Sequence, residues 1–227
     1  MKIPILFEDN HLLLVEKPIN VPVQADRSGD LDLLTILKND IKERYQKTGN
    51  VYLGLVHRLD RPVGGAMVFA KTSKAASRLS DMFRRQAVKR KYFAVVHGIP
   101  RKKKGKLAHY LLKDNRKNKV SVVSPNHPKA KKAVLDYEVI ESRKGFSLLS
   151  VKLHTGRPHQ IRVQLSKMGN PIFGDQKYGE HLSKPRQQLA LWAYSIYFEH
   201  PVRKEPLGIE SAPPNDYPWE FMRDYIK

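Results

Sequence analysis

The chain of 227 residues contains no cysteine. This absence excludes disulfide bonds, cysteine-ligated zinc and a cysteine nucleophile. The chain also has no run approaching the roughly 18 consecutive apolar residues of a membrane-spanning helix. The N-terminal stretch MKIPILFEDNH has only a short apolar run before charge returns. We therefore expect a soluble, cytoplasmic protein with no contact to a membrane and no export signal.

Sequence motifs for metals and nucleotides are absent as well. The 9 His residues lack the regular spacing of zinc ligands, and the glycines of PVGGA are not followed by the Lys-Ser/Thr pair of a phosphate-binding loop. We therefore expect no metal and no cofactor. Carboxylates, aromatic residues and arginines remain, and these can perform nucleophilic or acid-base chemistry unaided.

Acidic residues are scarce, with 22 Asp and Glu against 42 Lys and Arg and a net charge of +20. The imbalance is concentrated in residues 84–132, which hold 17 basic residues and one acid, Asp114. The same segment contains the β-prone runs YFAVVHG and KVSVVS, so a basic sheet face is favoured over a disordered tail. Such a surface indicates a polyanionic partner, which by charge alone could be RNA, DNA or an anionic membrane. We expect nucleic acid and no membrane, and nucleic acid is also favoured over a merely solvated surface.

The apolar pattern predicts more strands than helices. Helical spacing occurs in residues 33–41 with Asp30 as N-cap, in residues 73–83 with Ser73 as N-cap, and in residues 158–168. Strands and helices do not alternate regularly, so we predict an α+β fold. Aromatic residues after the proline-rich segment 201–218 are expected to pack on the core. The apolar runs that predict strands are residues 3–7, 12–15, 51–56, 66–70, 92–96, 120–123, 134–140, 146–153 and 189–198.

Three segments could carry chemistry. In VHRLDRPVGG, Asp60 lies between two arginines at the end of an apolar run. In KRKYFAVVHG, Tyr92 begins a predicted strand after a cluster of basic residues, and in LHTGRPHQIRVQL, Arg162 lies one turn inside a predicted helix. Taken singly, each has an ordinary structural interpretation: a surface ion pair, a buried ring and a helix-surface charge.

Together these segments resemble the motifs of the RluA family of RNA pseudouridine synthases, in that family's order and approximate spacing. The stretches ILFEDNHLLLVEKPINVPVQ, GNPIFGDQKYG and LALWAYSIYFEHP extend the resemblance over nearly the whole chain. The resemblance implies one catalytic domain, residues 1–227, with a mixed, mostly antiparallel sheet in two subdomains, a central active-site cleft and peripheral helices. It also implies that uridines in ribosomal or transfer RNA are converted to pseudouridine without a cofactor or metal.

The resemblance further implies roles for individual residues. Asp60 would be the nucleophile, acting at the ribose C1′ or on the uracil ring, Arg162 its basic partner, and Tyr92 the ring that packs on the target uracil and helps remove the C5 proton. Arg58 would displace the target base from its stack. The remaining residues expected to contact RNA, or to support such contacts, are His57, Arg157, His159, Arg84, Lys89 and Lys91.

The chain departs from the family pattern in two respects. Val63-Gly64-Gly65 stands where many members have Thr-Ser-Gly, and the two glycines are expected to permit a tight turn. ILFEDNHLLLVEKP begins at residue 5, so we expect no separate S4-type RNA-binding domain. We also expect a monomer. Two alternatives remain: a non-catalytic RNA-binding or ribosome-assembly protein on the same fold, and a glycosidase or nucleosidase, which would ordinarily need a second carboxylate.

Overall fold

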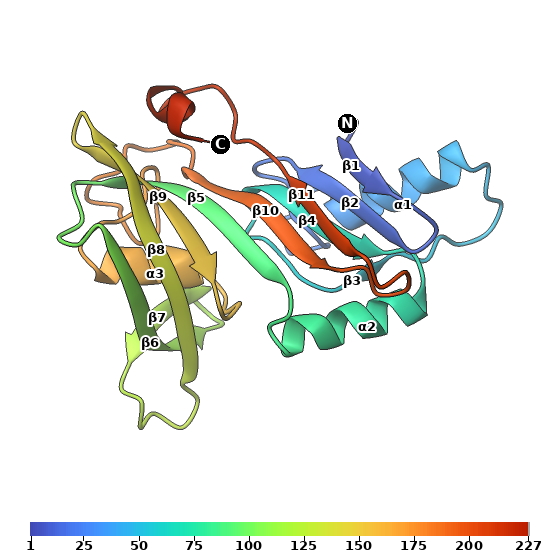
Figure 1. Cartoon of the computed structure of the whole chain (residues 1–227), viewed down its shortest axis with the longest axis horizontal. Helices are drawn as coiled ribbons and strands as arrows, with labels where there is room; N and C mark the ends of the chain where they lie inside the picture. Colours follow the sequence, from blue (N-terminus) through green and yellow to red (C-terminus); the bar gives the residue numbers. More distant parts are fainter. Residues whose placement is uncertain (227) are drawn as a thin grey trace. The chain divides into compact units, whose positions relative to one another are not determined.

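The computed structural model describes residues 1–226, and the chain divides into two compact units (Figure 1). The first unit consists of Met1–Arg90 and Ala193–Ser211, and the second of Lys91–Trp192 and Ala212–Lys227. Both units combine antiparallel strands with a few helices, so the predicted α+β class and its two subdomains are confirmed. The expectation of one catalytic domain stays a prediction.

The first unit is built on strands in the order β1-β2-β4-β10, with β3 paired to β4 and β11 to β10. Its core contains Leu14 of β2, Val68 of β4, Leu79 of α2 and Ile196 of β10. The strand β10 begins two residues before the boundary of this unit. The elements are β1 (Ile5–Glu8), β2 (Leu12–Lys17), α1 (Leu33–Arg44), β3 (Gly54–Leu55), β4 (Gly64–Ala70), α2 (Ser73–Arg84), β10 (Leu191–Glu199) and β11 (Pro206–Glu210).

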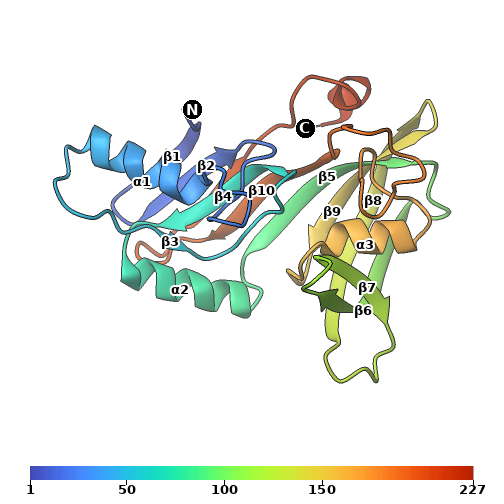
Figure 2. The ribbon, with the colours of Figure 1, turned by 180° about the vertical axis from the view of Figure 1, so that it is seen from behind.

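The second unit has the strand order β5-β9-β8-β6-β7, with each neighbouring pair antiparallel. The helix α3 contacts β6 and β7, as Figure 2 shows from behind. A small core of Leu111, Val120, Ala133 and Val163 joins these elements. The elements are β5 (Lys89–His97), β6 (Lys104–Asp114), β7 (Lys119–Val123), β8 (Lys131–Arg143), β9 (Phe146–Leu153), α3 (Gln160–Lys167) and the 3₁₀ helix η1 (Trp219–Tyr225).

The three predicted helices are confirmed, but their caps differ from the expectation. Asp32, not Asp30, caps α1 by accepting from the Thr35 N–H at 3.1 Å. Thr72, not Ser73, caps α2 by accepting from the Ala75 N–H at 3.2 Å. The predicted cap Asp30 lies two residues before the true cap of α1, and the predicted cap Ser73 lies one residue after the true cap of α2. The apolar pattern fixes the buried face of a helix and not its terminus.

Two strands escaped the sequence analysis. β6 begins with the exposed Lys104 and Lys106, has only one fully buried position, Leu111, and its longest apolar run is the short Tyr110–Leu112. β11 lies within the segment that was expected to be a proline-rich loop. The expected packing of the C-terminal aromatics is confirmed for Trp219, which is 3% exposed. The Tyr217 ring also meets Phe146 and Phe173 edge-on.

Candidate active site

Asp60 lies in a turn between β3 and β4. The Val63 N–H donates to the carbonyl oxygen of Asp60 at 3.0 Å, which closes the turn. The preceding Leu59 is buried, whereas Asp60 is partly exposed. The turn is therefore anchored beside a buried residue, while Asp60 itself keeps part of its surface exposed.

The glycines after this turn have a different function from the one expected. Gly64 and Gly65 open β4 and do not form the turn itself. Gly65 has φ +112, and a Cβ there would lie 2.3 Å from the carbonyl oxygen of Ala193 in β10. Glycine is required at 65 because the backbones of β4 and β10 approach closely.

Lys17 at the end of β2 supports the Asp60 turn. Its side chain is fully buried, and its Nζ donates to the carbonyl oxygens of Pro18 at 2.8 Å, Arg61 at 2.9 Å and Val63 at 2.7 Å. Burial lowers the pKa of Lys17 to about 7, although the negative charge of Asp60 acts to raise it. Within the first unit, Lys17 therefore interacts electrostatically with Asp60 when it is protonated, and burial disfavours that protonated form.

The neighbours of Asp60 have separate surroundings. Arg61 pairs with Asp30 and donates from Nε to the carbonyl oxygen of Asn20 at 3.1 Å, so it ties the turn to the loop before α1. Arg58 is exposed, as a side chain that displaces a base would have to be. His57, the residue before Arg58, is only partly exposed.

His57 makes contacts inside the first unit. Its Nε2 accepts from the Val68 N–H at 3.1 Å, and its ring stacks on Phe83 at 4.8 Å. Burial and the charge of Arg90 lower the pKa of His57 to about 3, so the ring is neutral and can accept this hydrogen bond. The role expected for His57, RNA contact or support of such contact, stays a prediction.

Tyr92 is 6% exposed in β5, where it lies opposite Val151 of β9. The basic residues before Tyr92 become less exposed along the chain, since Arg84 and Lys89 are exposed and Lys91 is partly buried. The Nζ of Lys91 lies 4.8 Å from the centre of the Phe93 ring. The strand therefore begins with cations at the surface and continues into the core.

The entrance to α3 is organised by Gln160. Its Oε1 accepts from the Thr155 hydroxyl at 2.8 Å and from the Arg157 N–H at 3.0 Å, while its Nε2 donates to the Val134 carbonyl oxygen. Arg157 is exposed, and its Nε donates to the Lys132 carbonyl oxygen at 3.0 Å. The helix starts at Gln160, two residues after Pro158, because His159 takes a left-handed conformation with φ 51.

Arg162 is buried and forms a two-pronged pair with Asp175 of the second unit. Its Nε and one terminal nitrogen each donate to a different Asp175 carboxylate oxygen at 2.8 Å. Burial raises the pKa of Asp175, but the hydrogen bonds and charge of Arg162, together with the N–H groups of Lys177 and Tyr178, hold it below its usual value. The pair fixes both the charge and the direction of the Arg162 guanidinium.

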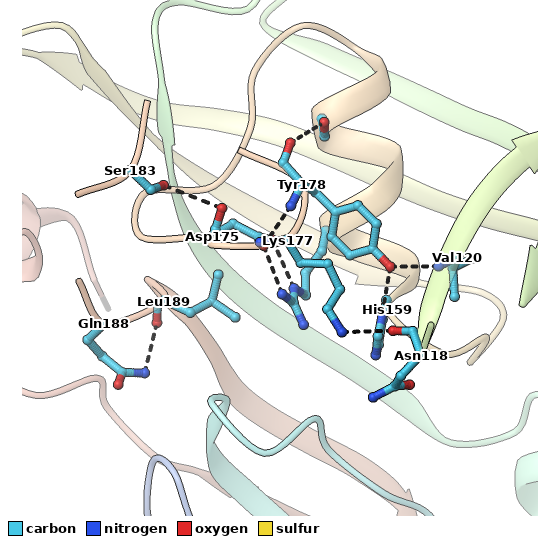
Figure 3. Close-up of polar contacts among 11 residues, drawn as sticks. Asn118, Val120, His159, Asp175, Lys177, Tyr178, Ser183, Gln188 and Leu189 are labelled. Carbon is cyan, nitrogen blue, oxygen red and sulfur yellow. Dashed lines mark hydrogen bonds and ion pairs between the residues drawn. The ribbon is translucent and has the colours of Figure 1, made fainter. Parts of the chain in front are cut away.

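Tyr178 connects this pair to its surroundings (Figure 3). Its hydroxyl accepts from the Val120 N–H at 2.8 Å and lies 2.7 Å from His159 Nδ1, and the Arg162 guanidinium lies 5.2 Å from the centre of its ring. The same figure shows Lys177 reaching the Asn118 carbonyl oxygen. The segment 175–178 therefore links α3 to β7 and holds Arg162 between them.

A sequence model described as RNA pseudouridylate synthase matches residues 11–167. The chain belongs to the RNA pseudouridylate synthase family. This confirms the expected RluA-type activity, the isomerisation of uridine in RNA to pseudouridine, and does not support the non-catalytic alternative.

Individual relatives agree with this family assignment. The chain is 35% identical over 218 residues to the uncharacterized RNA pseudouridine synthase YhcT of Bacillus subtilis, covering 95% of this chain and 70% of the relative. It is 33% identical to the ribosomal large subunit pseudouridine synthase C of Buchnera aphidicola, covering 94% and 67%. Among solved structures, human RNA pseudouridylate synthase domain containing 4 matches with a TM-score of 0.78 and 26% identity, over 93% of this chain and 88% of that one.

For this pseudouridylate synthase family member, the fold groups the predicted site residues in two sets. Asp60, Arg58 and His57 belong to the first unit, and Tyr92 and Arg162 to the second. The predicted pairing of Asp60 with Arg162 therefore stays a prediction. What the structure adds is a neighbour for each: Lys17 for Asp60 and Asp175 for Arg162.

Lys17, Asp175 and Tyr178 had no predicted role, although all three occur in the stretches that resemble the family. A signal was available for Asp175, since it is the acid within the stretch IFGDQKYG and lies between Gly174 and Gly179. A buried lysine gives no comparable signal, because in a basic chain it looks like one more surface charge.

The part of the chain that the structure describes contains no cluster of three or more His, Asp or Glu that could hold a metal ion. In residues 1–226 no helix is long and apolar enough to cross a membrane.

Proposed function

We propose that this RNA pseudouridine synthase uses Asp60 as its nucleophile at the ribose C1′ of the target uridine, with Tyr92 and Arg162 as direct partners. In this scheme Asp60 bonds to C1′ as the N1–C1′ bond breaks and the uracil leaves with its electron pair. After the uracil turns, C5 bonds to C1′ and Asp60 is released. The C5 proton is then lost, with Tyr92 assisting, and N1 gains a proton, so that the product is an isomer of the substrate.

The observation that carries this proposal is the way in which the Asp60 turn is held. Asp60 is partly exposed, and its turn is closed by the Val63 N–H. The Nζ of Lys17 donates hydrogen bonds to the carbonyl oxygens of Arg61 and Val63 and so holds the backbone of the turn. A nucleophile held in a fixed position pays little entropic cost on reaching the reacting atom. The fixed guanidinium of Arg162, held by Asp175, supports a role as an electrostatic partner.

The substrate proposed is a uridine in ribosomal RNA, with transfer RNA as the second candidate. Relatives named for the ribosomal large subunit support ribosomal RNA. Arg58, which is exposed beside Asp60, is proposed to displace the target base, and the exposed side chains of Arg84, Lys89 and Arg157 to contact RNA. Lys91 and His159 complete the proposed RNA contacts. We further propose that the protein is a monomer and that it is cytoplasmic, the compartment in which a ribosomal RNA substrate would be met.

Release of tritium from C5-tritiated uridine in RNA tests the catalytic proposal. Asp60→Asn should lower release by more than about 1,000-fold, because it removes the group that forms the covalent bond. Asp114→Asn is the matched control, since that carboxylate accepts only turn N–H groups at an exposed site and should keep normal activity. Undiminished release by Asp60→Asn would overturn the assignment of Asp60. Pseudouridine mapping in total RNA with and without the protein identifies the substrate.

A further inference from the structure

A cavity of about 450 Å³ lies in the second unit, among β6, β7, the loop before β8 and the entrance to α3. Its apolar lining includes Pro158, which is exposed, together with Leu111 and Val120, which also belong to the small core of this unit and are each 3% exposed. Its size falls within the ~300–1,000 Å³ typical of small-molecule sites. No group of the proposed catalytic set, Asp60, Tyr92 and Arg162, lines it.

The strand register explains how the cavity acquires both apolar and charged walls. Lys113 lies opposite Val120 of β7, and Leu111 lies opposite Lys131 of β8. Because residues i and i+2 share one face of a strand, and directly opposed residues share that face, these four side chains project to the same side of the sheet. Two apolar side chains are therefore flanked by two lysines.

The charge around the cavity is of one sign. Besides Lys113 and Lys131, the lining includes Lys129 and Arg157, and no acid lines it among the described residues. The three lysines are exposed, and Arg157 is held in place by its hydrogen bond to the Lys132 carbonyl oxygen. The nearest acid along the chain, Asp114, faces the N–H groups of Arg116 and Lys117 in the turn that follows. Four cations around an apolar floor match an anionic ligand that has an apolar face.

We propose that this cavity binds one nucleotide of single-stranded RNA outside the target uridine, with the base on the apolar floor and its flanking phosphates on the lysines. The inference rests on the proposed function, since it takes RNA as the partner. The side-chain amide of Asn115, which also lines the cavity, can both donate to and accept from a base edge. The cavity is thus an accessory site that helps to choose the RNA segment bound.

An unpaired strand is the occupant that the chemistry favours. In an RNA duplex the bases are stacked and paired, so only phosphates and 2′-hydroxyls reach a protein surface. A duplex could use the four cations but not the apolar floor. A single strand can insert a base and place phosphates on the rim at the same time.

Cross-linking locates the ligand directly. The full chain is irradiated with a short single-stranded RNA containing 4-thiouridine, and the cross-linked residues are identified by mass spectrometry. We expect adducts within residues 111–120 or 129–131 that a duplex of the same sequence does not give. Absence of adducts from both segments, with adducts elsewhere, would overturn the proposal.

Charge reversal tests the contribution to affinity. Lys113→Glu with Lys131→Glu should weaken binding of the single strand by more than about tenfold, because two phosphate contacts are lost. The matched control is Lys102→Glu with Lys103→Glu, which makes the same charge change at exposed lysines outside the cavity. It should weaken binding no more than about threefold. Thermal unfolding verifies that both variants fold.

The outcomes separate this proposal from the proposed function. Equal loss of single-strand affinity in the two double variants would mean a diffuse charge effect and would overturn the cavity site. If the wild-type chain cross-links through the cavity but releases no tritium from any RNA, the assignment of catalysis fails while the accessory site stands. If duplex and single strand lose affinity equally in the cavity variant, a base on the apolar floor is excluded.

Discussion

At the scale of single residues, the pair of Arg162 and Asp175 fixes the guanidinium that we propose as the basic partner of Asp60. Asp175 is fully buried, and the Arg162 side chain is 8% exposed. Two charges are stable there because each neutralises the other and because the remaining oxygen lone pairs accept from the Lys177 and Tyr178 N–H groups. Arg162 is therefore held in its charged form and in a fixed direction.

Removal of the Asp175 charge should be costly. We expect Asp175→Asn to lower the free energy of unfolding by about 3–5 kcal/mol, because a buried guanidinium then lacks its counter-charge. Asp136→Asn is the control, since that side chain is 40% exposed in its pair with His154 and should cost about 0–1 kcal/mol. Urea unfolding of both variants measures the difference. Equal, small losses would show that the pair does not hold Arg162.

At the scale of elements, the Asp60 turn depends on a side chain from a neighbouring strand. Lys17 ends β2 and lies opposite Gly65 of β4, and its Nζ bonds the backbone on both sides of Pro62. Lys17 therefore connects β2 to the Asp60 turn, which leads directly into β4. Gly65 completes this arrangement, since only glycine allows β4 to approach Ala193 of β10.

Replacement of Lys17 should loosen this structure in a pH-dependent way. Lys17→Met leaves three carbonyl oxygens without their donor and should lower the free energy of unfolding by about 3 kcal/mol. The folded-state pKa of about 7 lies below the ordinary 10.5, so between these values the unfolded chain binds a proton that the folded chain has released. The Lys17 contribution to stability therefore rises with pH from about 7 to 10.5 and is lost as pH falls through that window.

The measurement is urea unfolding of the wild-type chain and of Lys17→Met between neutral and alkaline pH. The difference in unfolding free energy between the two should grow as pH rises. Lys42→Met, at an exposed position of α1, serves as the control and should show neither the loss nor the slope. A difference that stays constant with pH would contradict the lowered pKa of Lys17.

At the scale of the whole molecule, the main feature is an excess of positive charge. The net charge of +20 is concentrated in residues 84–132, which form β5, β6, β7 and the start of β8. Most of these basic residues lie in the second unit, where strands of one sheet present them as an ordered surface, while Arg84, Arg85, Lys89 and Arg90 lie in the first unit. Sparse acids leave this surface uncompensated, which suits a phosphate backbone.

RNA affinity should accordingly depend strongly on salt. With at least four phosphate contacts to a single strand, a slope of about −0.7 per contact in log K against log salt predicts a loss of roughly 50-fold between 50 and 200 mM salt. Fluorescence anisotropy with a labelled RNA measures it. Asp60→Asn, which removes a negative charge outside the basic segment, should leave the slope unchanged. A slope near zero would show that the basic surface does not contact the backbone.

Much of this protein could be predicted from its sequence. Residues at helical spacing, such as Leu37, Ile41 and Leu79, fix a buried face wherever the helix packs, so all three helices were predicted. The family motifs placed Asp60, Tyr92 and Arg162 because their residue types and order are local features of the chain. β6 and β11 were missed, since a strand that is exposed and rich in lysine or proline carries no long apolar run.

The sequence by itself determined the α+β class, the basic character, the family and the residues to which the catalytic roles are assigned. The tertiary structure decided which residues support them: Lys17 lies 43 positions before Asp60, and Asp175 follows Arg162 by 13. Neither partner can be read from spacing, because strand pairing and helix packing choose which distant side chains meet. Burial then decides their chemistry, since a lysine or aspartate removed from water must find carbonyl oxygens or a counter-charge.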